Sequence, residues 1–262
     1  MLKKIKSDNS NEILKYIGKD YDKCLYLYLD YNKYKGENII IWEQFDEQNN
    51  IVAVILSYYT AVHIYSKNLD CNYVELTDLI KKISPSTINA RKEIIVKLID
   101  LLDDYDVEYG WIKKLSTDKL NVSDIHIVKK PSKNDLREIA KLQLTDDGMG
   151  SYYSFDVLLK QLKERNNQGF SRNYFIRINN KIVSHAATGG ELDNLAIITS
   201  VITDEKYRGR GLAYAVVSSL CYDLINEGKN VYLINYTNES SKLYEKIGFE
   251  VCCEWGKLYK KC

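Results

Sequence analysis

The feature that most constrains the fold is a glycine-rich turn between a strand and a helix. After a β-branched run at residues 195–203, the chain reads Tyr207-Arg208-Gly209-Arg210-Gly211-Leu212-Ala213 and continues into an apolar helical pattern. Glycines let the backbone approach a ligand closely, and the free N–H groups of a first helical turn lie at the positive end of the helix dipole. The pattern therefore predicts a phosphate site, and the two arginines suit a diphosphate.

Two common phosphate motifs do not fit this turn. Its two glycines are not followed by a third, and the strands before it read as hairpins, which excludes the dinucleotide fingerprint. The Gly-Lys-Ser/Thr of a P-loop is also absent. An isolated glycine pair is more often a solvated basic turn, so the surrounding pattern decides between the two interpretations.

The second half of the chain surrounds the turn with elements in a regular order. Asn179-Asn180 is a two-residue hairpin signal between two apolar runs. Strands are predicted at residues 125–129, 174–178, 181–187, 195–203, 231–235 and 249–259. Helices are predicted from about 132–135 onward, at 155–165, from the turn to 227, and at 238–247. This order predicts an α+β (mixed α/β) fold.

The first half has the same kind of elements without a glycine-rich turn. A helical pattern covers Ile13 to Ile17, and β-branched runs at 38–42, 51–56 and 61–65 predict a small antiparallel sheet. A further helical stretch from residue 76 to 102 is broken at Ser84-Pro85-Ser86. We place the domain boundary near residues 118–121, which gives domains 1–118 and 122–262.

Two motifs resemble the GCN5-related N-acetyltransferase (GNAT) family. The run from Arg208 to Ala213 matches its Arg/Gln-x-x-Gly-x-Gly/Ala signature, and Leu243-Tyr244-Glu245-Lys246-Ile247-Gly248-Phe249 is similar to its Leu-Tyr-x-Lys-x-Gly-Phe element. They occur in the family's order, one helix and one strand apart, and the resemblance covers residue 125 to the C-terminus. It implies a central, mostly antiparallel sheet flanked by helices. The smaller N-terminal α+β half is compatible with a degenerate copy of that fold.

The resemblance also implies an activity and a set of site residues. The expected reaction is acetyl-CoA-dependent transfer of an acetyl group to a primary amine by direct attack in a ternary complex. The residues expected to bind acetyl-CoA are Val201, Ile202, Thr203, Arg208, Gly209, Arg210, Gly211, Leu212, Ala213 and Asn238. Thr203 departs from the family's usual apolar residue. Asn238 also fits a helix cap, with Thr237 as a rival for the cofactor contact.

The catalytic groups expected from the resemblance are an acid and a base. Tyr244 occupies the position from which a phenol protonates the departing thiolate, and a tyrosine is protonated at neutral pH. The strand at 195–201 has no carboxylate, so the nearest candidates for the base are Glu191 and Asp193 in the preceding loop, with His185 behind them. Glu191 is the residue we assign, and ordered water is an equal rival. The missing strand glutamate keeps open an alternative, a non-catalytic acyl-CoA-binding regulatory module.

Composition excludes several other classes of protein. Lys+Arg 37 against Asp+Glu 36 gives a net charge of +1, which argues against nucleic acid and a membrane surface as partners. The six cysteines show no Cys-x-x-Cys pair and the three histidines are scattered, so no metal is expected. No signal peptide is apparent, which predicts a cytoplasmic protein with reduced thiols. The first half is a candidate either for shaping the acceptor pocket or for a homodimer contact, and the pattern does not specify the amine acceptor, small molecule or peptide.

Overall fold

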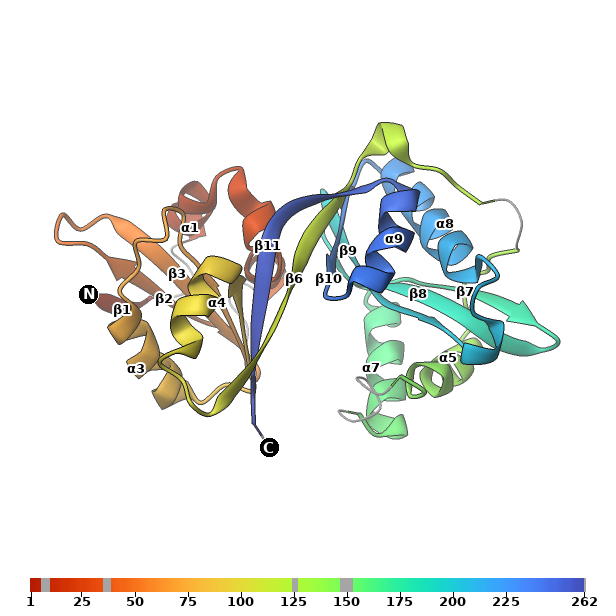
Figure 1. Cartoon of the computed structure of the whole chain (residues 1–262), viewed down its shortest axis with the longest axis horizontal. Helices are drawn as coiled ribbons and strands as arrows, with labels where there is room; N and C mark the ends of the chain where they lie inside the picture. The colour runs from red at the N-terminus through yellow and green to blue at the C-terminus, as the bar shows by residue number, and fades with distance from the viewer. Residues whose placement is uncertain (6–9, 35–38, 124–126, 147–152, 262) are drawn as a thin grey trace. The chain divides into compact units, whose positions relative to one another are not determined.

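The structure is a computed structural model that describes residues 1–5, 10–34, 39–123, 127–146 and 153–261 (Figure 1). Its internal contacts define two compact units. One contains residues 1–112 together with 251–262, and the other contains residues 113–250. Both units combine helices with a mostly antiparallel sheet, so the predicted α+β class is confirmed. Among the described helices, none is long and apolar enough to cross a membrane.

The C-terminal unit contains a four-strand run in the order β10-β9-β8-β7. The pairs β7/β8 and β8/β9 are antiparallel, whereas β9 and β10 are parallel. The strands are β7 (Asn173–Ile178), β8 (Lys181–Glu191), β9 (Leu195–Thr203) and β10 (Asn230–Asn235). The helices are α5 (Asp135–Gln143), α7 (Phe155–Asn167), the 3-10 helix η3 (Glu205–Tyr207), α8 (Leu212–Asn226) and α9 (Asn238–Ile247).

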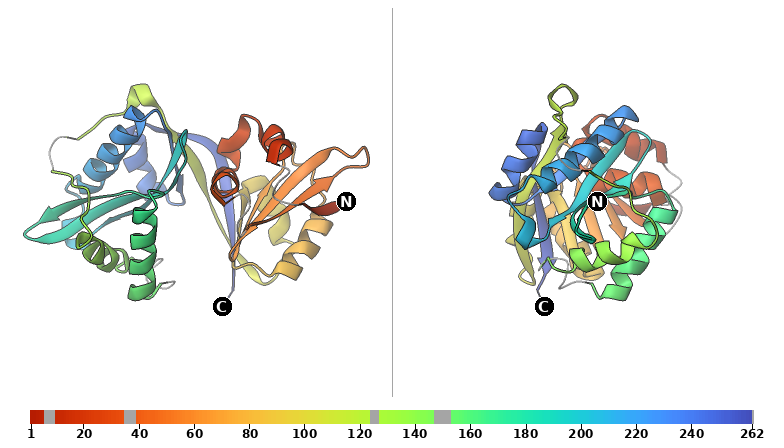
Figure 2. Two further views of the ribbon diagram at one scale, coloured as in Figure 1. Left: turned by 180° about the vertical axis from the view of Figure 1, so that it is seen from behind. Right: turned by 90° about the vertical axis from the view of Figure 1, so that its right-hand side faces the viewer.

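Helices cover both faces of this sheet (Figures 1 and 2). On one face, Val216 and Leu220 of α8 pack against Val183 and other strand residues in a fully buried cluster. On the opposite face, α5 and α7 pack against Phe175 and Ile182. The strand predicted at 125–129 falls partly outside the described residues, and its last residue, Lys129, forms an isolated bridge with Phe175.

The N-terminal unit contains a six-strand run in the order β1-β2-β3-β4-β5-β11. Apolar clusters lie on both of its faces, one against α3 and α4 and the other against α1 and α2. The strands are β1 (Leu2–Ile5), β2 (Ile39–Phe45), β3 (Ile51–Tyr58), β4 (Ala61–Tyr65), β5 (Thr87–Arg91), β6 (Tyr105–Leu115) and β11 (Phe249–Lys260). The helices are α1 (Ser10–Ile17), η1 (Asp20–Lys23), α2 (Leu25–Tyr34), α3 (Tyr73–Ile83) and α4 (Lys92–Ile99). The 3-10 helix η2 (Thr117–Lys119), which follows β6, belongs to the C-terminal unit.

The two halves of the chain repeat one order of elements. The series β2-β3-β4-α3-β5-α4-β6 corresponds step by step to β7-β8-β9-α8-β10-α9-β11. In both, two antiparallel pairings are followed by a helix and a parallel pairing, β4/β5 in the first half and β9/β10 in the second. The first half thus has the strand and helix order of the second.

Two features of the structure differ from the sequence interpretation. The helical stretch predicted from residue 76 to 102 contains a strand, β5, between α3 and α4. In addition, β11 pairs with β5 from Trp255–Arg91 to Tyr259–Thr87, so residues 251–262 group with the N-terminal unit by contacts. The division therefore differs from domains at 1–118 and 122–262, because the last strand pairs with one that is distant in sequence.

Candidate active site

The strands β9 and β10 separate at the end where the glycine-rich turn begins. Their parallel register runs from Leu195–Asn230 to Ile198–Leu233, whereas β9 itself continues to Thr203. Along β9 the side chains change from buried at residues 195–198 to half-buried at 199–203. Beyond residue 198, β9 no longer pairs with β10 in that register. The backbone groups on this edge of β9 can therefore hydrogen-bond to a ligand.

A β-bulge accompanies this separation. Between the pairs Ala187–Thr199 and His185–Ile202, β8 has one residue and β9 has two. Ser200, inside the bulge, has φ +52°, an unusual conformation for a residue with a side chain. Bulges redirect a strand, and here the redirected residues are 201–203.

The turn after β9 leaves the first N–H groups of α8 without a side-chain cap. Gly209 and Gly211 both have φ +75°, which glycine adopts without the strain that a Cβ brings. Gly211 is the N-cap residue and has no side chain that could accept from the helix. The corresponding helix of the first half is closed, because Oδ1 of Asn72 accepts from the N–H groups of Val74 and Glu75, both at 3.1 Å. Of these two corresponding helices, α8 has the uncapped start.

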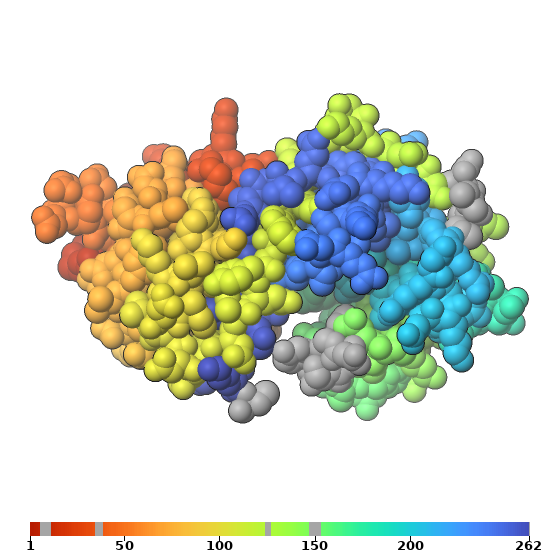
Figure 3. All heavy atoms as spheres, in the orientation of Figure 1, coloured from red at the N-terminus to blue at the C-terminus, as the bar shows by residue number. Residues whose placement is uncertain are grey.

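A cavity of about 670 Å³ lies at this point of the C-terminal unit. It joins the end of β9, the glycine turn, the start of α8 and one face of α9. Its walls are formed by Asp146, Val201, Ile202, Thr203, Tyr207, Arg208, Gly209, Gly211, Leu212, Ala213, Tyr214, Thr237, Glu239, Ser240, Leu243 and Tyr244. The start of α8 and α9 both reach the surface on the face shown in Figure 3.

Most of the residues expected to bind the cofactor lie in these walls, but two do not. Arg210 is directed to the turn itself, since its Nη2 donates to the carbonyl of Lys206 at 3.2 Å and its guanidinium packs over the ring of Tyr207. Asn238 is the first residue of α9 and is absent from the cavity walls. Its predicted role as the cap is wrong, because Oγ1 of Thr237 accepts from the N–H of Ser240.

Two other predicted cofactor residues are held by hydrogen bonds within the turn region. Nε of Arg208 donates to the carbonyl of Thr203 at 3.3 Å, which ties the arginine to the end of β9. The Thr203 hydroxyl lies 2.9 Å from Oγ of Ser184, and this bond accounts for a polar residue at a position that is usually apolar. Arg208 is exposed and, among the described residues of the cavity walls, is the only arginine or lysine.

Tyr244 lies in the cavity wall and packs edge-on against Phe249, with ring centroids 6.0 Å apart. Burial raises the pKa of Tyr244 to about 12. The phenol therefore stays protonated at neutral pH and can donate. Cys221 is fully buried in α8, and burial raises the pKa of its thiol, which fits its predicted place in the core.

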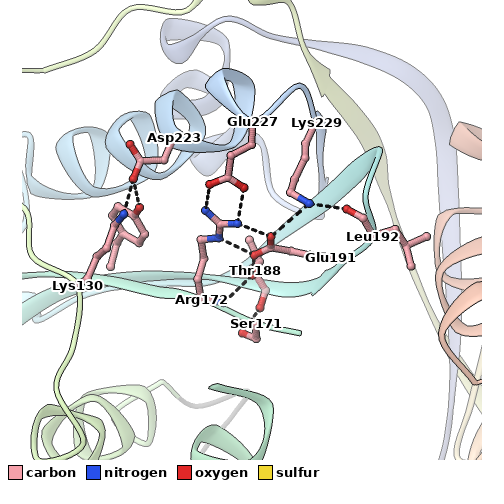
Figure 4. Close-up of polar contacts among 10 residues, drawn as sticks. Lys130, Ser171, Arg172, Thr188, Glu191, Leu192, Asp223, Glu227 and Lys229 are labelled. Carbon is pink, nitrogen blue, oxygen red and sulfur yellow. Dashed lines mark hydrogen bonds and ion pairs between the residues drawn. The ribbon is translucent and has the colours of Figure 1, made fainter. Parts of the chain in front are cut away.

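Glu191 lies elsewhere, in a salt-bridge network on the α8 side of the sheet (Figure 4). Its side chain is 6% exposed and accepts from Arg172 through Nε at 2.8 Å and Nη2 at 2.7 Å. Thr188 donates to it at 2.7 Å, and Nζ of Lys229 is 3.8 Å away. In register it pairs with Ala196, five residues along β9 from Val201, or about 16 Å at strand spacing. The structure does not bring Glu191 to the cavity.

The second base considered, His185, is fully buried. Burial lowers the pKa of its imidazole to about 4, so the ring is neutral at pH 7. Its nitrogens are occupied by Ser200, Asn173 and Gln143 and not by the cavity.

The sequence interpretation missed several residues of the cavity wall. Glu239 and Ser240 belong to the first turn of α9, so the motif around Tyr244 gave an indirect signal for them. Asp146 follows α5 and comes from more than fifty residues upstream of the turn, and no local pattern marks it. It is one of two carboxylates in the wall.

Comparison with known proteins agrees with this architecture. The family model described as GNAT acetyltransferase matches residues 113–258. The chain therefore belongs to the GNAT acetyltransferase family, in a two-domain form, and is by that membership an acyltransferase. A search of the curated proteins found no match.

Solved structures show the same fold over nearly the whole chain. A GCN5-related N-acetyltransferase from Sphaerobacter thermophilus is 15% identical, with a TM-score of 0.67 and coverage of 99% of this chain and 95% of that one. An acetyltransferase from the GNAT family of Colwellia psychrerythraea is 14% identical, with a TM-score of 0.62 and full coverage of both chains. A tandem GNAT protein from the clavulanic acid biosynthesis pathway is 10% identical, with a TM-score of 0.62 and 98% coverage of each chain.

Proposed function

We propose that this protein is an acetyl-CoA-dependent N-acetyltransferase that acetylates a primary amine by direct attack in a ternary complex. The observation that carries the proposal is the convergence of three groups on one cavity: the redirected end of β9, the uncapped start of α8 and the Tyr244 phenol. The amine acceptor, small molecule or peptide, is not specified by this arrangement.

The residues of the cavity fit the chemical parts of acetyl-CoA. Backbone N–H groups at residues 209–213, with Arg208 beside them, suit a diphosphate. The backbone of residues 201–203 can pair with an amide-containing arm, as an exposed strand edge does. Bound there, acetyl-CoA would supply an acetyl group activated as a thioester.

Tyr244 would act as the general acid of this reaction. Its pKa of about 12 keeps a proton on the phenol oxygen, available for the thiolate that leaves. Among the described residues, no hydrogen bond of the Tyr244 hydroxyl competes for that proton.

Asp146 is the base that we propose in place of Glu191. An ammonium group must lose a proton before nitrogen can attack, and the carboxylates in the cavity wall are Asp146 and Glu239. Glu239 has a structural reason for its position, because an acidic residue in the first turn of α9 is stabilised by the helix dipole. Asp146 follows the C-terminal end of α5, where the dipole gives no such reason for a carboxylate.

The direct test measures thiol release from acetyl-CoA over a panel of primary amines, with wild type and Tyr244→Phe in parallel. Turnover with at least one amine, reduced in the variant, supports the proposal. CoA binding without turnover on any amine would favour a non-catalytic acyl-CoA-binding module, and the absence of CoA binding would reject both.

A further inference from the structure

The bulge in β9 has a buried histidine as its partner. Nδ1 of His185 lies 3.0 Å from the carbonyl oxygen of Ser200, the bulge residue with positive φ. His185 is in β8, directly opposite Ile202 on β9 and Phe175 on β7, and so lies on the α5 side of the sheet. Its side chain comes from the strand next to the cavity wall, although His185 itself is not in the wall.

A bulge removes regular ladder partners, and this one lies against a buried histidine. A buried carbonyl without a donor is costly, and a left-handed residue with a side chain adds strain. His185 supplies the donor for the Ser200 carbonyl: a carbonyl oxygen can only accept, so Nδ1 of His185 must donate. The surroundings favour the neutral ring, since burial lowers the pKa of His185 to about 4.

Two buried amides complete the surroundings of the ring. Nε2 lies 3.0 Å from the amide of Asn173, and Gln143 lies 3.3 Å from Nδ1. Among the described residues, Nδ2 of Asn173 and Oε1 of Gln143 have no partner in the observed orientation. With each amide turned by 180°, Nδ2 of Asn173 donates to Nε2 of a neutral ring protonated at Nδ1, and Oε1 of Gln143 shares the Nδ1–H with the Ser200 carbonyl. The hydrogen-bonding groups around the ring thus suit the tautomer that donates to Ser200.

We propose that His185 is a positioning residue that holds the β9 bulge and so presents the backbone of residues 201–203 to the cosubstrate. This inference rests on the proposed function, because the cosubstrate is the ligand that the presented backbone binds. His185 acts through the backbone, and neither nitrogen takes part in the proton transfers.

The test compares two amide substitutions, each of which places a nitrogen where one of the two ring nitrogens of His185 lies. In His185→Asn the amide nitrogen can occupy the place of Nδ1, and in His185→Gln it reaches the place of Nε2. Calorimetric titration with CoA should give a Kd for His185→Asn within about threefold of wild type, and a Kd roughly tenfold weaker for His185→Gln, the cost of one buried hydrogen bond. In turnover, the KM for acetyl-CoA should rise in His185→Gln while kcat changes little.

A control separates positioning from general loss of stability. Leu158→Ala, in the buried cluster of α7 on the same face of the sheet, should lower the melting temperature and leave the Kd for CoA unchanged. Equal Kd values for the Asn and Gln variants, whether both strong or both weak, would overturn the inference. Failure of the wild type itself to bind CoA would overturn the proposed function and this inference with it, and that result is distinguishable because it needs no variant.

Discussion

Replacing Arg172 by methionine should destabilise the C-terminal unit through the network that holds Glu191. In the wild type, Arg172 lies between two carboxylates, with Glu191 on one side and Glu227 at 2.6 and 2.7 Å on the other (Figure 4). These two acids raise the pKa of Arg172, Glu227 first, and the arginine lowers the pKa of Glu227. The network joins the residue before β7, the end of β8 and the C-cap residue of α8.

The size of the effect follows from the burial of Glu191. Removing one partner of a buried ion pair costs roughly 3 to 5 kcal/mol, because the other charge stays buried. Glu191 keeps the Thr188 hydroxyl and Lys229 at 3.8 Å, which places the expected loss near about 3 kcal/mol. Glu227 is 45% exposed and adds at most about 1 kcal/mol.

Urea unfolding, followed by circular dichroism, measures this loss. The double variant Arg172→Met/Glu191→Met should recover at least half of it, since the buried charge is gone. A control at the exposed pair Lys160–Glu164, Lys160→Met, should change stability by less than about 0.5 kcal/mol. A loss below about 1 kcal/mol for Arg172→Met would refute the view that Glu191 is a structural carboxylate.

Three further outcomes are expected. Tyr244→Phe should lower kcat by roughly 100-fold or more and leave the affinity for CoA unchanged. Because the pKa of Tyr244 in the wild type is raised to about 12, the pH–rate profile of wild-type kcat should show no alkaline decline from this group between pH 8 and 10. Asp146→Asn should lower kcat/KM for the amine by roughly 100-fold, whereas Glu239→Gln should change it less than about threefold; steady-state kinetics with equal losses in both variants would contradict the assignment. Because the pKa of His185 is depressed in the folded protein, the unfolded state takes up the proton of this histidine first as the pH falls. The free energy of unfolding should therefore decrease between about pH 6.5 and pH 4, by at most about 1.4 kcal/mol per pH unit from this group. Urea unfolding at several pH values should show a shallower pH dependence in His185→Asn than in the wild type.

Local patterns predicted the elements around the glycine turn well. The hairpin at Asn179-Asn180 and the helix from residue 238 to 247 lie where the turn chemistry and the apolar periodicity indicate. The strand at Thr87–Arg91 was missed, because it has only five residues and is followed directly by the apolar helical pattern of α4. Short apolar runs of this kind do not distinguish the two structures.

The parts of the site that the sequence did not predict depend on tertiary pairing. Asp146 lies in the cavity wall because α5 packs on the sheet. Glu191 lies outside the wall and forms a salt bridge with Arg172, which is nineteen residues earlier in the sequence. Proximity in sequence to the strand suggested Glu191 as a base. The register of β8 on β9 instead places it near the opposite end of β9.

The most direct test of the central claim is amide hydrogen exchange, read by mass spectrometry, with and without CoA. The account predicts protection at residues 201–203 and 209–213, the backbone at the end of β9 and the start of α8, with no protection at residues 66–75, where Asn72 already caps the corresponding helix. Protection of the first-half segment, or none at either place at saturating CoA, would contradict it.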